Sequence, residues 1–257
     1  MGKFDGILLM SDLDGTLCSA GTVSQENCDA IRYFQSEGGL FSVASGRNPD
    51  WLLNWKEYFV PNTWSAMING AVFCDATGKN FIFDQPAGME IVETAEQVMR
   101  ACPNLKSVFF CGCNQKPYEV PQGAFIDPEL LPSPIYKCLL RTSSEESDEH
   151  TAIVKKMLAP NYIVMRSWIN GIEFQPTGTG KGDAVHRMKE VLGERARIVV
   201  AVGNYENDID MIAAADIGYA VKDALDSVKA VADRITVPCA EHAIAHVISD
   251  LEKIERS

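Results

Sequence analysis

Two aspartates near the start of the chain, Asp12 and Asp14, are separated by one residue and followed by Gly15. The apolar run 7–11 before them predicts a buried strand, so both carboxylates lie at the carboxyl end of a strand, where open α/β sheets build their sites. Side chains alternate along a strand, so the carboxylates can share one face, where a divalent cation relieves their repulsion. The pair predicts a nucleophile, a proton carrier and a bridging Mg²⁺. An acidic turn around Gly15 is the ordinary alternative.

Three later loops carry groups suited to binding a phosphoryl group: Ser45-Gly46-Arg47, Gly180-Lys181-Gly182, and the run Gly203-Asn204-Tyr205-Glu206-Asn207-Asp208. Phosphoryl transfer requires in-line positioning and neutralisation of charge on the equatorial oxygens, which hydroxyl, amide and ammonium groups provide. Each loop also has an ordinary interpretation: Ser45 can cap the next helix, Lys181 can be a solvated loop lysine, and the Asn/Asp run can start a helix. The joint order of the loops favours phosphoryl chemistry.

The elements that position these loops alternate between strand and helix at both ends of the chain. In the first part we expect strands at 7–11, 40–44 and 66–68, helices from Ser24 to residue 37 and over 50–59, and a hairpin over 71–83. Beyond Pro176 we expect helices at 181–192, 208–215, 224–232 and 240–253 and strands at 198–202, 217–220 and 234–236. Strands separated by helices predict βαβ units, and therefore an α/β fold with a doubly wound, Rossmann-like parallel sheet.

The middle of the chain has a different pattern. Between residues 84 and 175 we expect helices at 90–101 and 147–158, and strands near 108–110 and at 136–141, 162–168 and 171–174. Asn170-Gly171 is a hairpin turn signal between the last two strands, and a loop rich in Pro and Gly lies between the first two. This α+β segment predicts an inserted domain at 84–175, within a core domain made of 1–83 and 176–257.

Composition limits the classes of partner. The formal net charge of −12 over 257 residues argues against nucleic acid and against an anionic membrane surface. No apolar run is long enough to span a bilayer and no signal-peptide pattern starts the chain, so we expect a cytoplasmic protein. The eight cysteines are scattered, which favours buried free thiols, and the pair Cys111/Cys113 has poor spacing for zinc. We expect a monomer or a weak homodimer.

Taken together, these motifs resemble those of haloacid dehalogenase superfamily phosphatases of the Cof-like subfamily. The resemblance covers essentially the whole chain and rests on five segments: 9–17, 43–47, Asn69-Gly70-Ala71, Lys181-Gly182 and 203–211. It implies a core with an inserted α/β cap domain and a Mg²⁺-dependent phosphomonoester hydrolase. The substrate implied is a small phosphorylated metabolite, with sugar phosphates as the first expectation.

The resemblance also implies residue roles. Asp12 would attack phosphorus to form an aspartyl-phosphate, and Asp14 would protonate the leaving oxygen and later deprotonate the hydrolytic water. Ser45 and Lys181 would hold the phosphoryl oxygens, with Lys181 also offsetting the charge on Asp12. Gly46, Arg47 and Asn207 would bind the phosphate. The metal would be held by the Asp12 carboxylate and the Asp14 carbonyl, together with Asn204 and Asp208.

One position departs from the family pattern. The fourth motif usually begins Gly-Asp, whereas this chain has Gly203-Asn204, which replaces an expected carboxylate ligand by a neutral amide. An amide oxygen can ligate Mg²⁺, but with one fewer negative charge, so we expect weakened Mg²⁺ affinity, with Asp208 compensating in part. Two alternatives to a hydrolase remain open: a phosphotransferase or mutase, and a weakly active or non-catalytic phosphate-binding protein.

Several other residues have two interpretations. Arg47 can contact the substrate phosphate or start a helix at the rim of the site. Trp51, Trp55 and Trp64 are expected to pack in the core rather than to act as sugar-binding platforms. Two residues of the insert, Trp168 and Glu173, are candidates to face the leaving group, because in this family the insert closes over the site.

Overall fold

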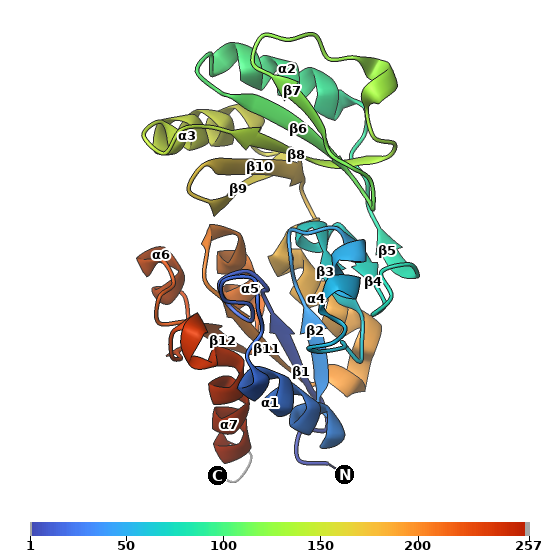
Figure 1. Ribbon diagram of the computed structural model, residues 1–257, viewed down its shortest axis with the longest axis vertical. Coiled ribbons are helices and arrows are strands. Elements are labelled where there is room, and N and C mark those ends of the chain that lie inside the picture. Colours follow the sequence, from blue (N-terminus) through green and yellow to red (C-terminus); the bar gives the residue numbers. More distant parts are fainter. Residues whose placement is uncertain (1, 255–257) are drawn as a thin grey trace. The chain divides into compact units, whose positions relative to one another are not determined.

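The computed structural model describes residues 2–254 and divides the chain into two compact units, coloured along the sequence in Figure 1. The first unit runs to Phe83 and resumes at Lys181, and the second is Asp84–Gly180. The predicted end of the insert, at residue 175, is therefore too early. The side-chain amide of Gln175 donates to the carbonyl oxygen of Thr179 at 2.6 Å, which ties the turn after the last strand to the second unit.

The first unit is built on a five-stranded parallel sheet in the order β13-β12-β11-β1-β2. Its strands are β1 (Ile7–Ser11), β2 (Leu40–Val43), β11 (Ile198–Gly203), β12 (Ile217–Ala220) and β13 (Arg234–Ile235). Ser11 at the end of β1 pairs with Val202 on one side and Val43 on the other. The carboxyl ends of β11, β1 and β2 therefore meet at the same end of the sheet, as the sequence predicts.

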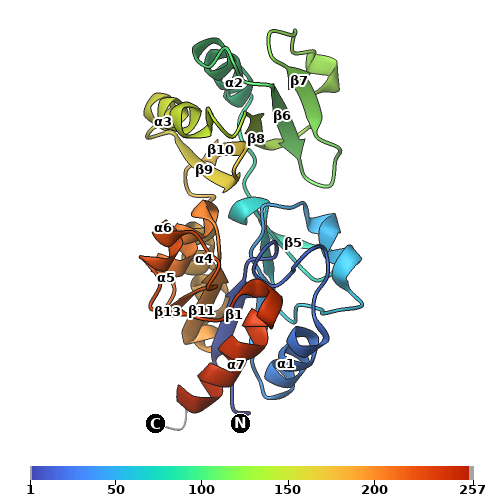
Figure 2. The same ribbon diagram turned by 60° about the vertical axis from the view of Figure 1, so that its left-hand side comes forward.

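Helices cover both faces of this sheet, so the doubly wound α/β fold is confirmed. They are α1 (Gln25–Ser36), α4 (Lys181–Leu192), α5 (Ile209–Ala214), α6 (Asp226–Lys229) and α7 (Ala243–Ile254). The side chains of β1 alternate between the two layers: Leu9 packs in the core that includes residues of α1 and α7, whereas Leu8 and Met10 pack with residues of α4 and α5. Figure 2 shows α1 and α7 on the same side of the sheet.

The start of α1 is capped by a side chain. Ser24 is the N-cap, and its hydroxyl accepts a hydrogen bond from the backbone N–H of Asn27 at 3.2 Å. This bond satisfies one of the backbone donors that a helix start leaves without an intrahelical partner.

Other predicted boundaries in this unit are wrong. The segment 50–59 is not an α-helix but a 3₁₀-helix, η1 (Pro49–Trp55). Its buried residues are Pro49, Leu52 and Trp55, and this spacing of three matches the 3₁₀ period, not the α-helical one. Two further helices are shorter than expected: 224–232 contains only α6, and 208–215 begins as a 3₁₀ turn, η5 (Glu206–Asp208), before α5.

The segment 65–84 forms a three-stranded sheet, β3-β4-β5, made of β3 (Ser65–Met67), β4 (Val72–Cys74) and β5 (Phe81–Asp84). The hairpin expected over 71–83 corresponds to β4 and β5. The expected third strand of the parallel sheet is instead β3, which pairs antiparallel with β4. It is linked to β2 by a parallel bridge between Ala44 and Ala66 and by a hydrogen bond from the N–H of Val43 to the hydroxyl of Ser65 at 3.4 Å. Ile68 and Asn69 turn the chain between β3 and β4 with positive φ of 52° and 56°. Asn69 and the following Gly70, with φ of 103°, tolerate this conformation, whereas it is strained for the β-branched Ile68.

The second unit is an antiparallel sheet in the order β7-β6-β8-β10-β9, with two helices. Its elements are α2 (Glu90–Ala101), β6 (Ser107–Gly112), β7 (Tyr118–Pro121), β8 (Ile135–Arg141), α3 (Ser147–Leu158), β9 (Tyr162–Trp168) and β10 (Gly171–Pro176). Alternate residues of the strands, such as Phe110, Leu140 and Phe174, share a core with Ile91 of α2 and Val154 of α3. Both helices are as predicted, but β7 falls in a segment that we expected to be a loop.

All eight cysteines are free thiols, and seven of them are buried, as the composition predicts. Within residues 2–254, no helix combines the length and the apolar character that a membrane span needs.

Candidate active site

The site lies in the first unit, at the edge where β1, β2 and β11 end. Asp12 directly follows β1, and its backbone N–H donates to the carbonyl oxygen of Val202 on β11 at 2.9 Å. Ser45 follows β2, and Lys181 is the first residue of α4. The sheet therefore brings together side chains that are distant in sequence: the contact between Lys181 and Asp12 spans 169 positions.

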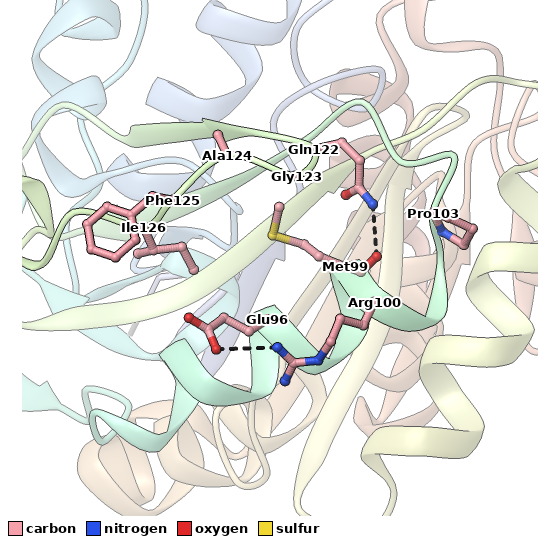
Figure 3. Close-up of a pocket in the computed structure, with 9 residues that line it drawn as sticks. All are labelled: Glu96, Met99, Arg100, Pro103, Gln122, Gly123, Ala124, Phe125 and Ile126. Carbon is pink, nitrogen blue, oxygen red and sulfur yellow. Dashed lines mark hydrogen bonds and ion pairs between the residues drawn. The ribbon is translucent and has the colours of Figure 1, made fainter.

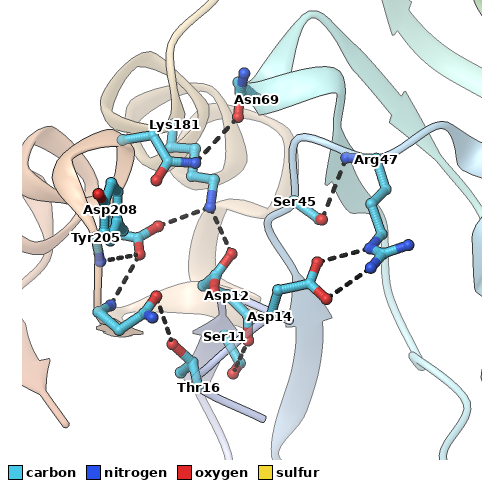
Figure 4. Close-up of polar contacts among 12 residues, drawn as sticks. Ser11, Asp12, Asp14, Thr16, Ser45, Arg47, Asn69, Lys181, Tyr205 and Asp208 are labelled. Carbon is cyan, nitrogen blue, oxygen red and sulfur yellow. Dashed lines mark hydrogen bonds and ion pairs between the residues drawn. The ribbon is translucent and has the colours of Figure 1, made fainter. Parts of the chain in front are cut away.

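Lys181 connects two buried carboxylates (Figure 4). Its ammonium nitrogen lies 2.7 Å from Oδ1 of Asp12 and 2.6 Å from Oδ1 of Asp208. All three side chains are almost completely removed from solvent. A buried ion needs a partner with good geometry, so the alternative in which Lys181 is a solvated loop lysine is wrong.

Burial and charge act in opposite directions on the two partners. Burial and the nearby charge of Asp208 raise the pKa of Asp12, and Lys181 opposes this shift. Burial alone would lower the pKa of Lys181, but Asp12 and Asp208 together outweigh it, so that its pKa is raised and its cation is stabilised. Lys181 thus opposes the protonation of Asp12 that burial favours, and a carboxylate nucleophile requires the anionic form.

Asp208 also organises the loop after β11. Its Oδ2 accepts hydrogen bonds from the backbone N–H groups of Asn204 at 2.9 Å and Tyr205 at 3.1 Å, while its Oδ1 faces Lys181. Gly203 permits this fold of the loop, because a Cβ at that position would lie 2.4 Å from Cβ of Asp208. Both oxygens of Asp208 are thus engaged, one by Lys181 and the other by the loop backbone.

Asn204 faces the loop that carries the two aspartates. Its side-chain oxygen accepts a hydrogen bond from the hydroxyl of Thr16 at 3.3 Å. Its amide nitrogen lies against Gly15, which has φ of +79° and where a Cβ would come within 2.3 Å of that nitrogen. Gly15 is thus required both by its backbone conformation and by the close approach of Asn204.

Ser45 is buried beside this centre, and its hydroxyl oxygen accepts from the backbone N–H of Arg47 at 3.3 Å. This contact fits the interpretation of Ser45 as a local cap as well as that of a phosphate ligand. The backbone oxygen of Ser45 accepts from the N–H of Asn69 at 2.9 Å, which fastens the turn after β3 to the site.

Asn69 is a site residue that the sequence reasoning did not assign. It is fully buried, and its side-chain oxygen accepts a hydrogen bond from the side-chain amide of Asn207 at 3.4 Å. The Asn-Gly turn signal was present in the sequence, but it gave no indication that the side chain would point toward Asn207. The pair shows that the loops after β3 and β11 meet at the site.

Arg47, for which the sequence leaves a phosphate contact and a place at a helix start open, is paired with Asp14. Its guanidinium forms a bidentate ion pair with Asp14, with Nε 2.6 Å from Oδ2 and Nη2 2.7 Å from Oδ1 (Figure 4). The hydrogen bond to Asp14 raises the pKa of Arg47. The two aspartates are thus held by different cations: Asp12 by buried Lys181 and Asp14 by half-exposed Arg47.

The predicted packing of the tryptophans is right for two of the three. Trp55 is buried in the core of the first unit, and Trp64 packs against the core layer on the other side of the sheet. Trp51 is 41% exposed, and its ring lies 4.1 Å from the guanidinium carbon of Arg47.

The oxygen donors present fit a small hard cation. Within residues 2–254, no group of three or more His, Cys, Asp or Glu residues has the arrangement of a metal site. The candidate ligands are instead Oδ2 of Asp12, which accepts no hydrogen bond from the described residues, the amide oxygen of Asn204 and the main-chain carbonyl of Asp14. Mg²⁺ uses few protein oxygens and keeps several waters, so this set suits Mg²⁺, although it contains a single carboxylate.

A separate cavity of about 340 Å³ lies in the second unit, between α2 and the segment 122–126 (Figure 3). Apolar side chains such as Met99 and Ile126 dominate its lining, and its two charged residues, Glu96 and Arg100, face each other at 3.6 Å. This ion pair is largely exposed, whereas Asp12 and Lys181 are buried, so we place the chemistry at the site in the first unit.

The whole chain matches known proteins. A family model described as haloacid dehalogenase-like hydrolase matches residues 9–120 and 113–248. Phosphatase YwpJ of Bacillus subtilis is 25% identical over 95% of this chain and 99% of its own length. The 5-amino-6-(5-phospho-D-ribitylamino)uracil phosphatase YcsE of the same organism is 28% identical over 94% of both chains. Among solved structures, the haloacid dehalogenase subclass IIB sugar phosphatase BT4131 superposes with a TM-score of 0.74 at 19% identity, covering 95% of this chain and 98% of its own.

Proposed function

The chain belongs to the haloacid dehalogenase-like hydrolases, and from that premise we propose that it is a Cof-like phosphatase that cleaves small phosphomonoesters through an aspartyl-phosphate on Asp12. The observation that carries the proposal is the environment of Asp12. This carboxylate is buried at the end of β1, one oxygen is paired with Lys181, and the other accepts no hydrogen bond from the described residues. A charged nucleophile with one uncommitted oxygen is what attack on phosphorus needs.

The reaction has two steps. An oxygen of Asp12 attacks phosphorus, the bond between phosphorus and the ester oxygen breaks, and Asp14 gives a proton to the departing oxygen. Water then attacks the phosphorus of the aspartyl-phosphate, Asp14 takes the proton of that water, and inorganic phosphate leaves with the Asp12 carboxylate restored. The same group acts first as acid and then as base, as general acid–base catalysis in two half-reactions requires.

The other residues bind and orient. Lys181 and Ser45 hold phosphoryl oxygens, and Lys181 offsets the charge that Asp12 shares with the phosphoryl group. Asp208 is a positioning residue, because its contacts run to Lys181 and to the loop backbone. Asn207 is oriented by Asn69 toward the phosphate position. Gly46, which has no side chain, allows the backbone beside Ser45 to approach the phosphoryl group closely.

Mg²⁺ fits the oxygen donors of Asp12, Asn204 and the Asp14 carbonyl, and when bound it would supply a Lewis acid at the phosphoryl oxygens. Asn204 contributes no charge to this set, so we propose that the metal is held less tightly than by a carboxylate at this position.

The substrate class is that of small phosphorylated metabolites. Sugar phosphates head the panel to be tested, because a sugar phosphatase shares this fold, and a phosphorylated ribityl compound of the kind named for YcsE follows. Of the two candidates in the second unit for contact with the leaving group, Trp168 is 39% exposed and stays the better one, because Glu173 is buried against Lys137.

The test is release of inorganic phosphate from this panel in the presence of Mg²⁺, with Asp12→Asn as the blank. The variant is close in volume to the wild type, and its circular dichroism spectrum and unfolding midpoint show whether it is folded. Acid quench of the wild type during turnover should trap a phosphoenzyme that Asp12→Asn lacks. Phosphate release equal to that of the blank would overturn the proposal, and transfer to a second sugar would indicate a phosphomutase.

A further inference from the structure

Trp51 is an exposed aromatic residue in direct contact with the active site. It belongs to η1, where Pro49, Leu52 and Trp55 face the core and Trp51 does not. Its exposed fraction of 41% is high for such a large apolar side chain. Its ring stacks on the guanidinium of Arg47 at 4.1 Å, well within the range of a cation–π contact.

Arg47 connects this ring to Asp14. Both oxygens of the carboxylate are engaged, at 2.6 Å and 2.7 Å, in the planar two-point geometry that only arginine offers. Arg47 therefore has an aromatic plane on one side and a carboxylate at its edge, and these contacts fix both the tilt and the direction of the guanidinium.

The side chain of Asp14 needs a partner that fixes its orientation more than the side chain of Asp12 does. Its side chain is 52% exposed, whereas Asp12 is buried against Lys181. An exposed carboxylate samples several rotamers, and ordering it costs conformational entropy. The bidentate pair selects one rotamer before the substrate arrives. When Asp14 carries its proton, one oxygen keeps its contact with Arg47 and the protonated oxygen is turned to the leaving group, within hydrogen-bond reach of which a proton donor must lie.

We propose that Trp51 and Arg47 form a positioning pair for Asp14, in which the ring of Trp51 orients Arg47 and Arg47 orients the carboxylate that moves the proton. This inference rests on the proposed function and adds to it two residues that act through Asp14. It removes Arg47 from the set of phosphate ligands and gives Trp51 a role in proton transfer instead of core packing.

The test compares two leaving groups. An alkyl phosphate, such as a sugar phosphate found to be cleaved, needs a proton on its departing oxygen, whereas p-nitrophenolate leaves without one. The parameter kcat/KM reports the steps up to departure of the alcohol, so later hydrolysis of the phosphoenzyme does not enter it. Variants that disturb only proton transfer lower kcat/KM for the alkyl ester and leave that for p-nitrophenyl phosphate near its wild-type value.

We expect Trp51→Ala to lower kcat/KM for the alkyl ester about threefold, in keeping with an exposed cation–π contact, and Trp51→Phe to restore most of it. Arg47→Lys should lower it about tenfold, because an ammonium group cannot make the two-point contact. The matched control is Leu53→Ala: Leu53 lies on the same 3₁₀-helix and is equally exposed at 41%. This control should leave both substrates unchanged.

Equal losses on both substrates would overturn the inference, since they would mean that Arg47 binds the phosphoryl group itself. Unchanged kinetics of both Trp51 variants would overturn the role of the ring. A wild-type protein that cleaves neither ester would instead refute the proposed function, so the two failures are distinguishable. Melting temperatures of all variants identify any loss that comes from unfolding.

Discussion

The ammonium group of Lys181 lies 2.7 Å from Oδ1 of Asp12, and this contact joins the first residue of α4 to the residue that follows β1. Lys181 is equally close to Asp208, so one buried cation serves two buried anions. Asp12, Lys181 and Asp208 form a small network of charges that depend on one another. Removal of the cation therefore affects stability as well as catalysis.

Lys181→Met should abolish phosphate release and lower the free energy of unfolding by about 3–5 kcal/mol, because it leaves Asp12 and Asp208 buried without a cation. Urea unfolding followed by circular dichroism measures the second effect. Lys189→Met is the matched control: Lys189 is on the same helix, but its pair with Asp216 is at the surface, so its removal should cost less than about 1 kcal/mol. A Lys181→Met protein as stable as this control would contradict the role of the network.

Asn204→Asp should tighten Mg²⁺ binding, because it adds a charged oxygen at the position where the loop after β11 faces Gly15 and Thr16. We expect the dissociation constant from calorimetric titration to fall about tenfold, and the Mg²⁺ concentration for half-maximal activity to fall with it. Asn204→Ala, which removes the oxygen altogether, should weaken binding. Equal affinity of the wild type and the aspartate variant would show that position 204 does not contact the metal.

The second unit contains its own buried ion pair, in which Lys137 of β8 lies 2.7 Å from Glu173 of β10. Glu173→Ala should destabilise the protein by about 3–5 kcal/mol, because the ammonium group stays buried after its partner is removed. The double variant Lys137→Met/Glu173→Leu should regain most of that loss, since apolar residues of similar volume avoid the desolvation cost. Chemical denaturation of the wild type, Lys137→Met, Glu173→Leu and the double variant closes the cycle, and a double variant less stable than both single variants would refute this explanation.

Asp75, in the turn between β4 and β5, should titrate at unusually low pH. Its slight burial would raise its pKa, but hydrogen bonds from Thr77 and Asn80 outweigh this effect and lower the pKa to about 2. A carboxyl whose pKa is lower in the folded state stabilises the fold above its ordinary value, and that contribution is lost as the pH falls from about 4 to about 2. NMR titration of the carboxyl carbon measures the shift, and Thr77→Ala should move the pKa back toward 3.8. A wild-type pKa already at 3.8 would contradict the prediction.

The sequence by itself determined the fold class and most of the centre of the site. Apolar runs followed by Asp12, Ser45 and the 203–208 loop are local signals, and parallel strands bring their carboxyl ends to one edge whatever the details of packing. Helices such as α2, α3 and α4 were also predictable, because each has a clear apolar stripe or start signal.

Only the tertiary structure decided how the charges are paired. Whether Arg47 faces a phosphate or Asp14, and whether Asp208 faces a metal or Lys181, depends on which loops meet across the end of the sheet. Sequence spacing carries no information about side-chain direction between loops that are distant in the chain. The exposure of Trp51 was equally unpredictable, because a 3₁₀-helix and an α-helix over the same residues turn different side chains toward the core.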